Sequence, residues 1–346
     1  MTGKGPIPVR EVKVSGTAEV LSVIQGATEP MVFRGACRSW PLVQAGLESE
    51  NAAIDYLRRM HADVLGVTVE TPPSERGRLS FNDTVTGFNF QHSMLPIGQL
   101  LDTIQAENAK SDPRGLYAFL DLRQVPGLAA ENGSEFDALG GTRALIVSNR
   151  ACTPAHFDFP NNLPCNLVGE RTFTIFPTDQ VKNLYTGPLG MSPSGHEVSM
   201  VDFRAVDVAR FPKAATALDN AQQVRLKPGD ILFLPSMWWH HIDVHSNFNI
   251  LMPQWWRSGP EWLGQTYDAL RHAVLCIRDL PKSQRQAWKA LFEHYVFDHD
   301  DHFPEHLPPA VRGPLASPMT EESAKSLRAD LASKLQPPQA PPASQT

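Results

Sequence analysis

The chain has 346 residues, of which 42% are hydrophobic and 20% are charged, so it can bury a sizeable core and is not disordered as a whole. Its formal net charge of −6 argues against a broad basic surface, and we expect no nucleic-acid partner. The 30 prolines disfavour a mainly helical protein, because each proline removes a backbone donor and fixes φ. Together these values favour a β-rich architecture with many loops.

The cysteines and the first residues bear on the compartment. The chain has four cysteines, at Cys37, Cys152, Cys165 and Cys276. Their spacing contains no CxxC pair, which argues against a zinc site or a dense disulfide framework and favours a reducing compartment. Residues 1–6 contain no apolar signal segment, and no stretch approaches the ~20 apolar residues of a membrane span. We therefore expect a cytoplasmic protein with no membrane partner.

The N-terminal part, residues 1–110, has a mixed pattern. The apolar spacing of amphipathic helices occurs at Ala18–Gln25, Asn51–His61 and Leu95–Ala106. Short apolar runs typical of strands occur at Met31–Arg34 and Val64–Val69. These elements predict an α/β decoration that packs on the rest of the chain.

The middle part, residues 111–257, is dominated by short β-rich runs between turn signals. These runs lie at Leu116–Leu122, Ala144–Ser148, Thr172–Phe176, Gln223–Leu226, Ile231–Leu234 and Asn249–Met252. Gly- and Pro-containing pairs separate them. Strands at this spacing predict a barrel or a sandwich.

The C-terminal part returns to helical spacing. Within residues 258–300, apolar residues step by three and four before and after a break at Asp279–Lys282, which predicts a helical hairpin. Such aromatic-rich helices either cover the barrel or form a homodimer interface. Residues 301–346 are rich in proline, with one short helix predicted at Thr320–Leu335 and a flexible tail beyond it.

Two segments supply side chains that can hold a metal. His156 and Asp158 are two residues apart, so on a strand both side chains point to the same face. In Pro228–His241, a Pro-Gly-Asp turn, an apolar strand and a second turn precede His240 and His241. Adjacent strand residues point to opposite faces, so one of these histidines faces the metal and the other is a hydrogen-bonded core residue.

The combination of two imidazoles and one carboxylate has a preferred metal. His156, Asp158 and one histidine of the second segment form a 2-His-1-carboxylate triad, which leaves open coordination positions and favours non-haem Fe(II) over zinc. Spacing alone does not choose between His240 and His241. The Pro228–His241 segment also resembles the second signature of the cupin superfamily.

An ordered set of motifs extends this resemblance over roughly two-thirds of the chain, from Met31 to Trp256. The motifs are Asn82–Phe90, Thr153–Asp158, Gly169–Pro177, Pro228–His241 and Gln254–Arg257. With them the chain resembles the cupin-like JmjC group of Fe(II)/2-oxoglutarate-dependent oxygenases, especially the asparaginyl hydroxylase that inhibits hypoxia-inducible factor and its bacterial relatives. The resemblance implies a double-stranded β-helix (jelly-roll) barrel, Fe(II) and 2-oxoglutarate as cofactors, and hydroxylase activity.

The resemblance also assigns residues. It prefers His240 as the second imidazole ligand and places Arg171, Thr153, Tyr117 and Asn162 around 2-oxoglutarate, whose distal carboxylate needs a cation and hydroxyl donors. Among the tryptophans, usually core residues, the candidates for substrate contact are Trp239 and Trp255. The expected substrate is a protein side chain or an amino-acid-like small molecule.

Two positions depart from the family pattern. Arg171 stands where the family commonly has lysine; it keeps the charge but changes the length. Pro253 stands where the family often has an asparagine that contacts the cosubstrate region, with Asn249 or Gln254 as neighbours that could compensate. These departures leave two alternatives open, a non-catalytic JmjC-like binding module and a metal cupin that does not use 2-oxoglutarate.

Overall fold

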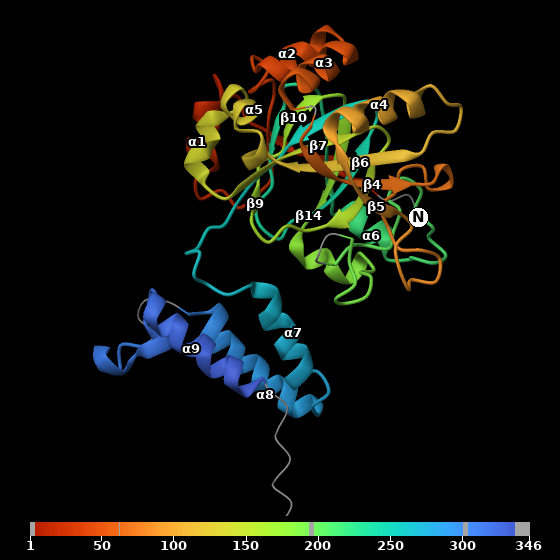
Figure 1. Cartoon of the computed structure of the whole chain (residues 1–346). Coiled ribbons are helices and arrows are strands. Elements are labelled where there is room, and N and C mark those ends of the chain that lie inside the picture. Colours follow the sequence, from red (N-terminus) through yellow and green to blue (C-terminus); the bar gives the residue numbers. More distant parts are fainter. Residues whose placement is uncertain (1–3, 62, 194–196, 300–303, 336–346) are drawn as a thin grey trace, which may run out of the picture. The chain divides into compact units, whose positions relative to one another are not determined.

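The computed structural model describes residues 4–61, 63–193, 197–299 and 304–335. The chain divides into two compact units, Met1–Ser258 and Gly259–Thr346 (Figure 1). The first unit contains every strand among the described residues. The regular structure of the second unit is helical throughout its described residues.

Two sheets form the body of the first unit. The smaller has the order β1-β12-β11-β14-β8. Its strands are β1 (Ile7–Pro8), β12 (Gln222–Leu226), β11 (Arg171–Phe176), β14 (Trp239–Val244) and β8 (Cys152–His156). Its central strand pairs are antiparallel, and β11 pairs with both β12 and β14.

The larger sheet has the order β2-β3-β13-β10-β15-β7-β6-β4-β5. Its strands are β2 (Arg10–Glu11), β3 (Met31–Phe33), β13 (Ile231–Phe233), β10 (Cys165–Val168), β15 (Asn249–Met252), β7 (Thr142–Ser148), β6 (Gly115–Asp121), β4 (Leu65–Thr71) and β5 (Gln91–Pro96). The short strand β16 (Gln254–Trp256) pairs with β7 and with β9 (Asn161–Asn162).

The chain alternates between the two sheets, as a double-stranded β-helix requires. Strands β7 and β8, β10 and β11, and β13 and β14 are consecutive in the chain but belong to opposite sheets. A buried cluster fills the space between the sheets, with Phe173 and Val224 from the smaller sheet and Ile146, Leu232 and Leu251 from the larger. The predicted jelly-roll, cupin-type barrel with helical decoration is therefore confirmed.

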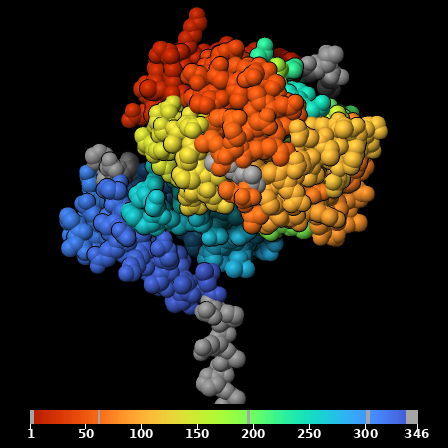
Figure 2. Space-filling model, turned by 45° about the horizontal axis from the view of Figure 1, so that its top comes forward, coloured from red at the N-terminus to blue at the C-terminus, as the bar shows by residue number. Residues whose placement is uncertain are grey.

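Helices cover the larger sheet. A separate short helix, α6 (Ala214–Asp219), precedes β12. The covering helices are α1 (Thr17–Ile24), α2 (Pro41–Glu48), α3 (Glu50–His61), α4 (Ile97–Asn108) and α5 (Pro126–Glu131). Their apolar faces share one core with that sheet, in which Leu42, Leu57, Leu100 and Leu128 are fully buried. Both views show α2, α3 and α5 side by side on this face (Figures 1 and 2).

The structure differs locally from the sequence predictions at two helices. The helix predicted at Leu95–Ala106 begins only at Ile97, because Leu95 and Pro96 continue β5 opposite Gly66 and Leu65 of β4. Helix α2 is not among the elements predicted from the sequence. It begins with Pro41 at its first turn, a position where the missing N–H costs nothing.

The second unit contains the predicted pair of helices. Helix α7 spans Thr266–Ile277 and α8 spans Lys282–Phe292, which continues as a π-helical turn over Glu293–Phe297. The predicted third helix is present as α9 (Glu321–Lys334), capped by the Thr320 hydroxyl, which accepts from the Ser323 N–H. Residues 336–346, where the flexible tail is predicted, lie outside the described residues. None of the described helices has the length and apolar character needed to cross a membrane.

A buried carboxylate at the end of α4 leads to a prediction about stability. Glu107 accepts hydrogen bonds from the Arg114 backbone N–H at 3.0 Å, from Arg114 Nε at 2.9 Å and from Lys110 Nζ at 2.7 Å. Burial raises its pKa, but the hydrogen bonds and charges of Arg114 and Lys110 outweigh burial and lower it to about 2. Glu107 therefore stabilises the fold in its ionised form.

We expect Glu107→Gln to lower the free energy of unfolding at pH 7 by about 2 kcal/mol, a value discounted for the exposure of both cations. Because the folded pKa lies below the unfolded value of 4.5, this stabilisation is complete above pH 4.5 and disappears as the pH falls toward 2. Urea unfolding of both proteins at pH 7, 4 and 3 measures the difference. Equal stabilities at pH 7 would contradict this assignment.

Candidate metal centre

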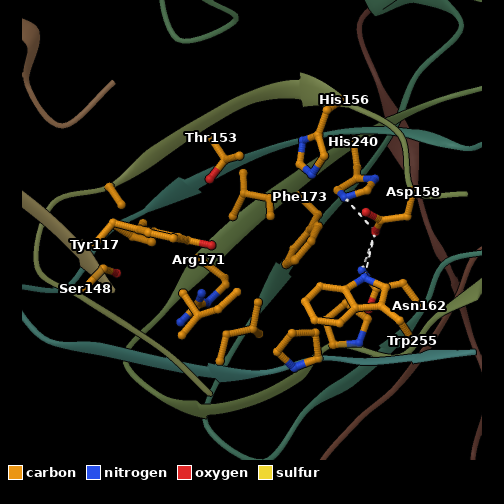
Figure 3. A pocket seen from close by; sticks show the side chains of 17 residues that line it. Tyr117, Ser148, Thr153, His156, Asp158, Asn162, Arg171, Phe173, His240 and Trp255 are labelled. Atoms are coloured by element: carbon orange, nitrogen blue, oxygen red, sulfur yellow. Dashed lines mark hydrogen bonds and ion pairs between the residues drawn. The ribbon is translucent and has the colours of Figure 1, made fainter. Parts of the chain in front are cut away.

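A cavity lies inside the barrel, between the two sheets. Its volume is about 70 Å³, room for several waters or part of a small organic acid, since one water needs roughly 10–15 Å³. Side chains from both sheets line it, including His156, Asp158 and His240 at one end and Tyr117, Ser148 and Arg171 at the other (Figure 3). The cavity therefore joins the residues predicted for the metal with most of those predicted for the cosubstrate.

Strand pairing brings the three predicted metal ligands together. His156 is the last residue of β8 and pairs with His240 of β14, and Asp158 follows two residues later. The ring centroids of the two histidines are 4.2 Å apart, and His240 Nε2 lies 3.7 Å from Asp158 Oδ2. One ligand atom from each residue lies within 4.8 Å of the other two. This spacing allows all three to bind one ion.

Both histidines are oriented by their own backbone. His156 Nδ1 lies 2.9 Å from the Pro154 carbonyl oxygen, and His240 Nδ1 lies 3.1 Å from the Trp238 carbonyl oxygen. A carbonyl oxygen can only accept, so each Nδ1 is the donor in this contact, and Nε2 is the ring nitrogen that remains available to a metal. A backbone contact of this kind is the usual support of a metal-binding histidine.

The Asp158 carboxylate is oriented by two side chains. Its Oδ2 accepts hydrogen bonds from Asn162 Nδ2 at 2.7 Å and from Trp255 Nε1 at 3.1 Å. Burial raises the pKa of Asp158, but the nearby His240 and His156 and these two hydrogen bonds outweigh burial and lower it. The carboxylate is therefore ionised, as metal binding requires. Figure 3 shows both donors converging on it from below.

The structure also separates His240 from His241. His240 lines the cavity, whereas His241 points to the opposite face of β14, where its Nε2 lies 3.8 Å from Cys152 Sγ. His241 Nδ1 is buried and has no hydrogen-bond partner. Burial lowers the pKa of His241 to about 3, so its ring is neutral. Strand alternation thus gives the two adjacent histidines different surroundings.

The far end of the cavity holds a buried cation. Arg171, on β11, is only 2% exposed; its Nε donates to Asn166 Oδ1 at 2.7 Å, while its Nη2 has no hydrogen-bond partner. Burial lowers the pKa of Arg171 to about 9 and raises that of Tyr117 to about 12, so at neutral pH one is a cation and the other a neutral phenol. An unpaired buried cation is costly unless an anion binds it.

These residues fit iron and 2-oxoglutarate. The donor set of two imidazoles and one carboxylate suits Fe(II), and the unpartnered Arg171 Nη2 provides the donor that a distal carboxylate needs. Thr153 lines the cavity between the two ends. Asn162 also lines it, but its Nδ2 binds the metal ligand Asp158, and its Oδ1 is buried without a partner.

Sequence reasoning missed three residues at this site. Phe173 lines the cavity two residues after Arg171 on the same strand, so the two-residue period could have identified it. Ser148 on β7 also lines the cavity, and it pairs with Tyr117 on the adjacent strand β6. Asn166 on β10 lies five residues before Arg171 and orients its guanidinium across the short connection between β10 and β11.

The remaining predicted residues fall in different places. Trp255 lines the cavity, whereas Trp239 points to the other face of β14 and packs against Phe157, with ring centroids 4.8 Å apart. Pro253 lines the cavity at the position where the family often has asparagine. Neither neighbour compensates: Gln254 bonds to Arg143 Nε, and Asn249 Nδ2 donates to the Asn149 and Ser246 carbonyls.

Comparisons with known proteins agree with this architecture. The family model of the cupin-like domain matches residues 17–261. The chain is 28% identical over 275 residues to the protein named lysine-specific demethylase JMJ31 of Arabidopsis thaliana, covering 70% of this chain and 48% of the relative. It is 27% identical over 154 residues to human HSPB1-associated protein 1, covering 43% and 29%.

A third relative is lysine-specific demethylase 8 of Xenopus tropicalis, 30% identical over 104 residues, which cover 30% of this chain and 22% of the relative. The chain thus spans less than half the length of these three curated relatives. The similarity lies in the unit that contains the barrel, since the family model ends at residue 261.

Proposed function

The chain belongs to the cupin-like JmjC family, and from this premise we propose that it is an Fe(II)- and 2-oxoglutarate-dependent oxygenase. One observation carries the proposal: a complete 2-His-1-carboxylate set and an unpartnered buried arginine line the same cavity. His156, Asp158 and His240 hold the metal. Arg171, with Tyr117 and Thr153, binds the distal carboxylate of 2-oxoglutarate.

Each part of the chain has a defined role in this proposal. When bound, iron and 2-oxoglutarate would together supply the electrons that activate oxygen for attack on a substrate C–H bond. The protein binds and orients the reactants, and the apolar cluster between the sheets keeps bulk water out of the cavity. Trp255 and Asn162 keep the Asp158 carboxylate in one orientation through their hydrogen bonds.

We propose that the substrate is a protein side chain or an amino-acid-like small molecule. Two relatives are named lysine-specific demethylases, which supports a protein or amino-acid substrate. The formal charge of −6 does not favour a nucleic acid. Trp255 is the best candidate for substrate contact, because it lines the cavity next to Asp158.

Conversion of 2-oxoglutarate to succinate tests the activity. The metal-free full chain is loaded with Fe(II) and supplied with ascorbate, 2-oxoglutarate and pools of peptides or metabolites. We expect succinate formation that one class of pool stimulates. Calorimetric titration of 2-oxoglutarate into the metal-loaded protein measures cosubstrate binding separately. If the protein neither forms succinate nor binds 2-oxoglutarate, the proposal fails.

Because Pro253 departs from the family pattern, the same experiment also tests the two alternative functions. Proline at this cavity position supplies neither an amide side chain nor a backbone donor. A non-catalytic binding module would bind metal, and could bind 2-oxoglutarate, without turnover. A metal cupin of another type would bind metal without binding 2-oxoglutarate. Metal content, calorimetric binding and succinate yield together distinguish the three functions.

The homodimer predicted through the C-terminal helices stays a prediction. Several apolar side chains of the second unit are exposed to solvent. The exposed fraction is 76% for Leu275 on α7 and 44% for Trp288 on α8. A second copy of the chain would remove such surface from water. We expect light scattering at micromolar concentration to give twice the chain mass, and Leu275→Glu with Trp288→Glu to give a folded monomer. A wild-type protein that is monomeric at this concentration would exclude the homodimer.

A further inference from the structure

A second cluster of metal-ligating side chains lies behind the first. Cys152 on β8 and His241 on β14 point away from the cavity, on the opposite face of the strands that carry His156 and His240. Asp202 approaches this face from the segment after the Val198 bridge to His156. One ligand atom from each of Cys152, Asp202 and His241 lies within 4.8 Å of the other two.

The ligand types suit zinc. Thiolate sulfur, imidazole nitrogen and carboxylate oxygen are the three protein ligands of Zn²⁺, with Zn–S near 2.3 Å and Zn–N near 2.0–2.1 Å. Tetrahedral geometry with those bond lengths places sulfur and nitrogen roughly 3.6 Å apart. The distance from Cys152 Sγ to His241 Nε2 is 3.8 Å. The two atoms are thus already close to the separation that a shared ion imposes.

The surroundings of the cluster also resemble those of a metal site. Cys152 and His241 are 1% and 3% exposed, so both side chains are shielded from bulk water. Arg204 orients the Asp202 carboxylate through three hydrogen bonds: its backbone N–H and its Nε each donate to Oδ1 at 3.0 Å, and its Nη2 donates to Oδ2 at 2.8 Å. Such a partner behind a ligating carboxylate is usual, and the carboxylate keeps further lone pairs. A thiolate and a carboxylate supply two negative charges to the ion, and the Arg204 cation beside Asp202 adds one positive charge.

From this geometry we infer a second metal site, in which Cys152, Asp202 and His241 bind one zinc ion on the outer face of the β8–β14 pair. The ion would connect the segment around Asp202 to the two strands that position the cavity ligands. Its fourth coordination position is left for water. The site needs neither 2-oxoglutarate nor the ligands inside the cavity.

The test starts from a variant that lacks the metal centre inside the cavity. In the His156→Ala/Asp158→Ala double variant, only the second site remains, so the fate of the proposed oxygenase does not affect the result. The metal-free double variant is titrated with Co²⁺, which absorbs in the near ultraviolet through charge transfer when a thiolate binds it. We expect one equivalent of Co²⁺ with this band, against two equivalents for the wild type.

Further variants assign the ligands. Adding Cys152→Ser to the double variant should remove the charge-transfer band, whereas Cys165→Ser, at a buried cysteine of the other sheet, should leave it. Asp202→Asn should weaken Zn²⁺ binding at least tenfold, and it keeps the variant testable because this side chain is 20% exposed. Zn²⁺ should also raise the unfolding temperature of the double variant.

The opposite results would overturn the inference. These are one equivalent of Co²⁺ in the wild type, none in the double variant, and no thiolate band in either. In that case Cys152 and His241 form only a buried thiol–imidazole contact.

Discussion

Replacing Asp158 by alanine should remove the metal from the cavity centre and reduce 2-oxoglutarate turnover more than ~100-fold. Asp158 supplies the only anionic ligand of the triad, and two donors hold it in place. Two imidazoles alone leave the ion without charge compensation. Iron content, measured after equilibration with Fe(II), should fall from about one equivalent to near zero. We expect His156→Ala to have the same effect.

The Asp158 variants should remain folded, and a matched control separates the loss of metal from a general loss of structure. Asp158→Asn retains an oxygen that can accept from Trp255, so its circular dichroism and unfolding temperature should stay close to wild type. Asp55→Ala, at an exposed position on α3, should change neither iron content nor turnover. An Asp158→Asn protein that still binds one iron with wild-type affinity would contradict the assignment.

Replacing Arg171 by methionine should raise the KM for 2-oxoglutarate by about 100-fold, because a charge-assisted hydrogen bond contributes roughly 1.5–3 kcal/mol and the distal carboxylate can accept two. Iron binding should not change, since Arg171 lies at the other end of the cavity from the metal ligands. Steady-state kinetics and calorimetry of the iron-loaded variant measure the effect.

The stability of the same variant provides a second readout. Arg171 is buried, its Nη2 is unpartnered, and no carboxylate among the described residues pairs with it. Removing this charge should leave the unfolding temperature of the metal-free protein unchanged or higher. Arg171→Lys should recover part of the affinity, whereas Arg225→Met, at an exposed arginine on the neighbouring strand, should have no effect on it. Unchanged affinity in Arg171→Met would remove Arg171 from the cosubstrate site.

Part of the site could be predicted from the sequence because it depends on local geometry. His156 and Asp158 lie two residues apart, and the turn–strand–turn pattern before His240 places a histidine at the start of a strand. The β-rich middle of the chain follows from short apolar runs between Gly and Pro residues. These features depend on strand alternation and turn chemistry, which act over a few residues.

Other features depend on contacts between distant segments. Trp255 reaches Asp158 from 97 positions further along the chain, and the pairing of β8 with β14 brings His156 to His240. Local spacing carries no information on such pairs. The choice between His240 and His241 belongs here too: the sequence requires that they face opposite ways, but only the packing of the two sheets decides which one faces the cavity.

By itself, the sequence determined the β-rich class, the ligand types and most strand positions, because periodicity and turn residues are local properties. The tertiary structure alone decided that the ligands and Arg171 share one cavity, and that Pro253 lines it without a compensating amide. It also brought Cys152, Asp202 and His241 together behind the centre. The physical reason is that register between strands far apart in the chain is set by the packing of the whole core.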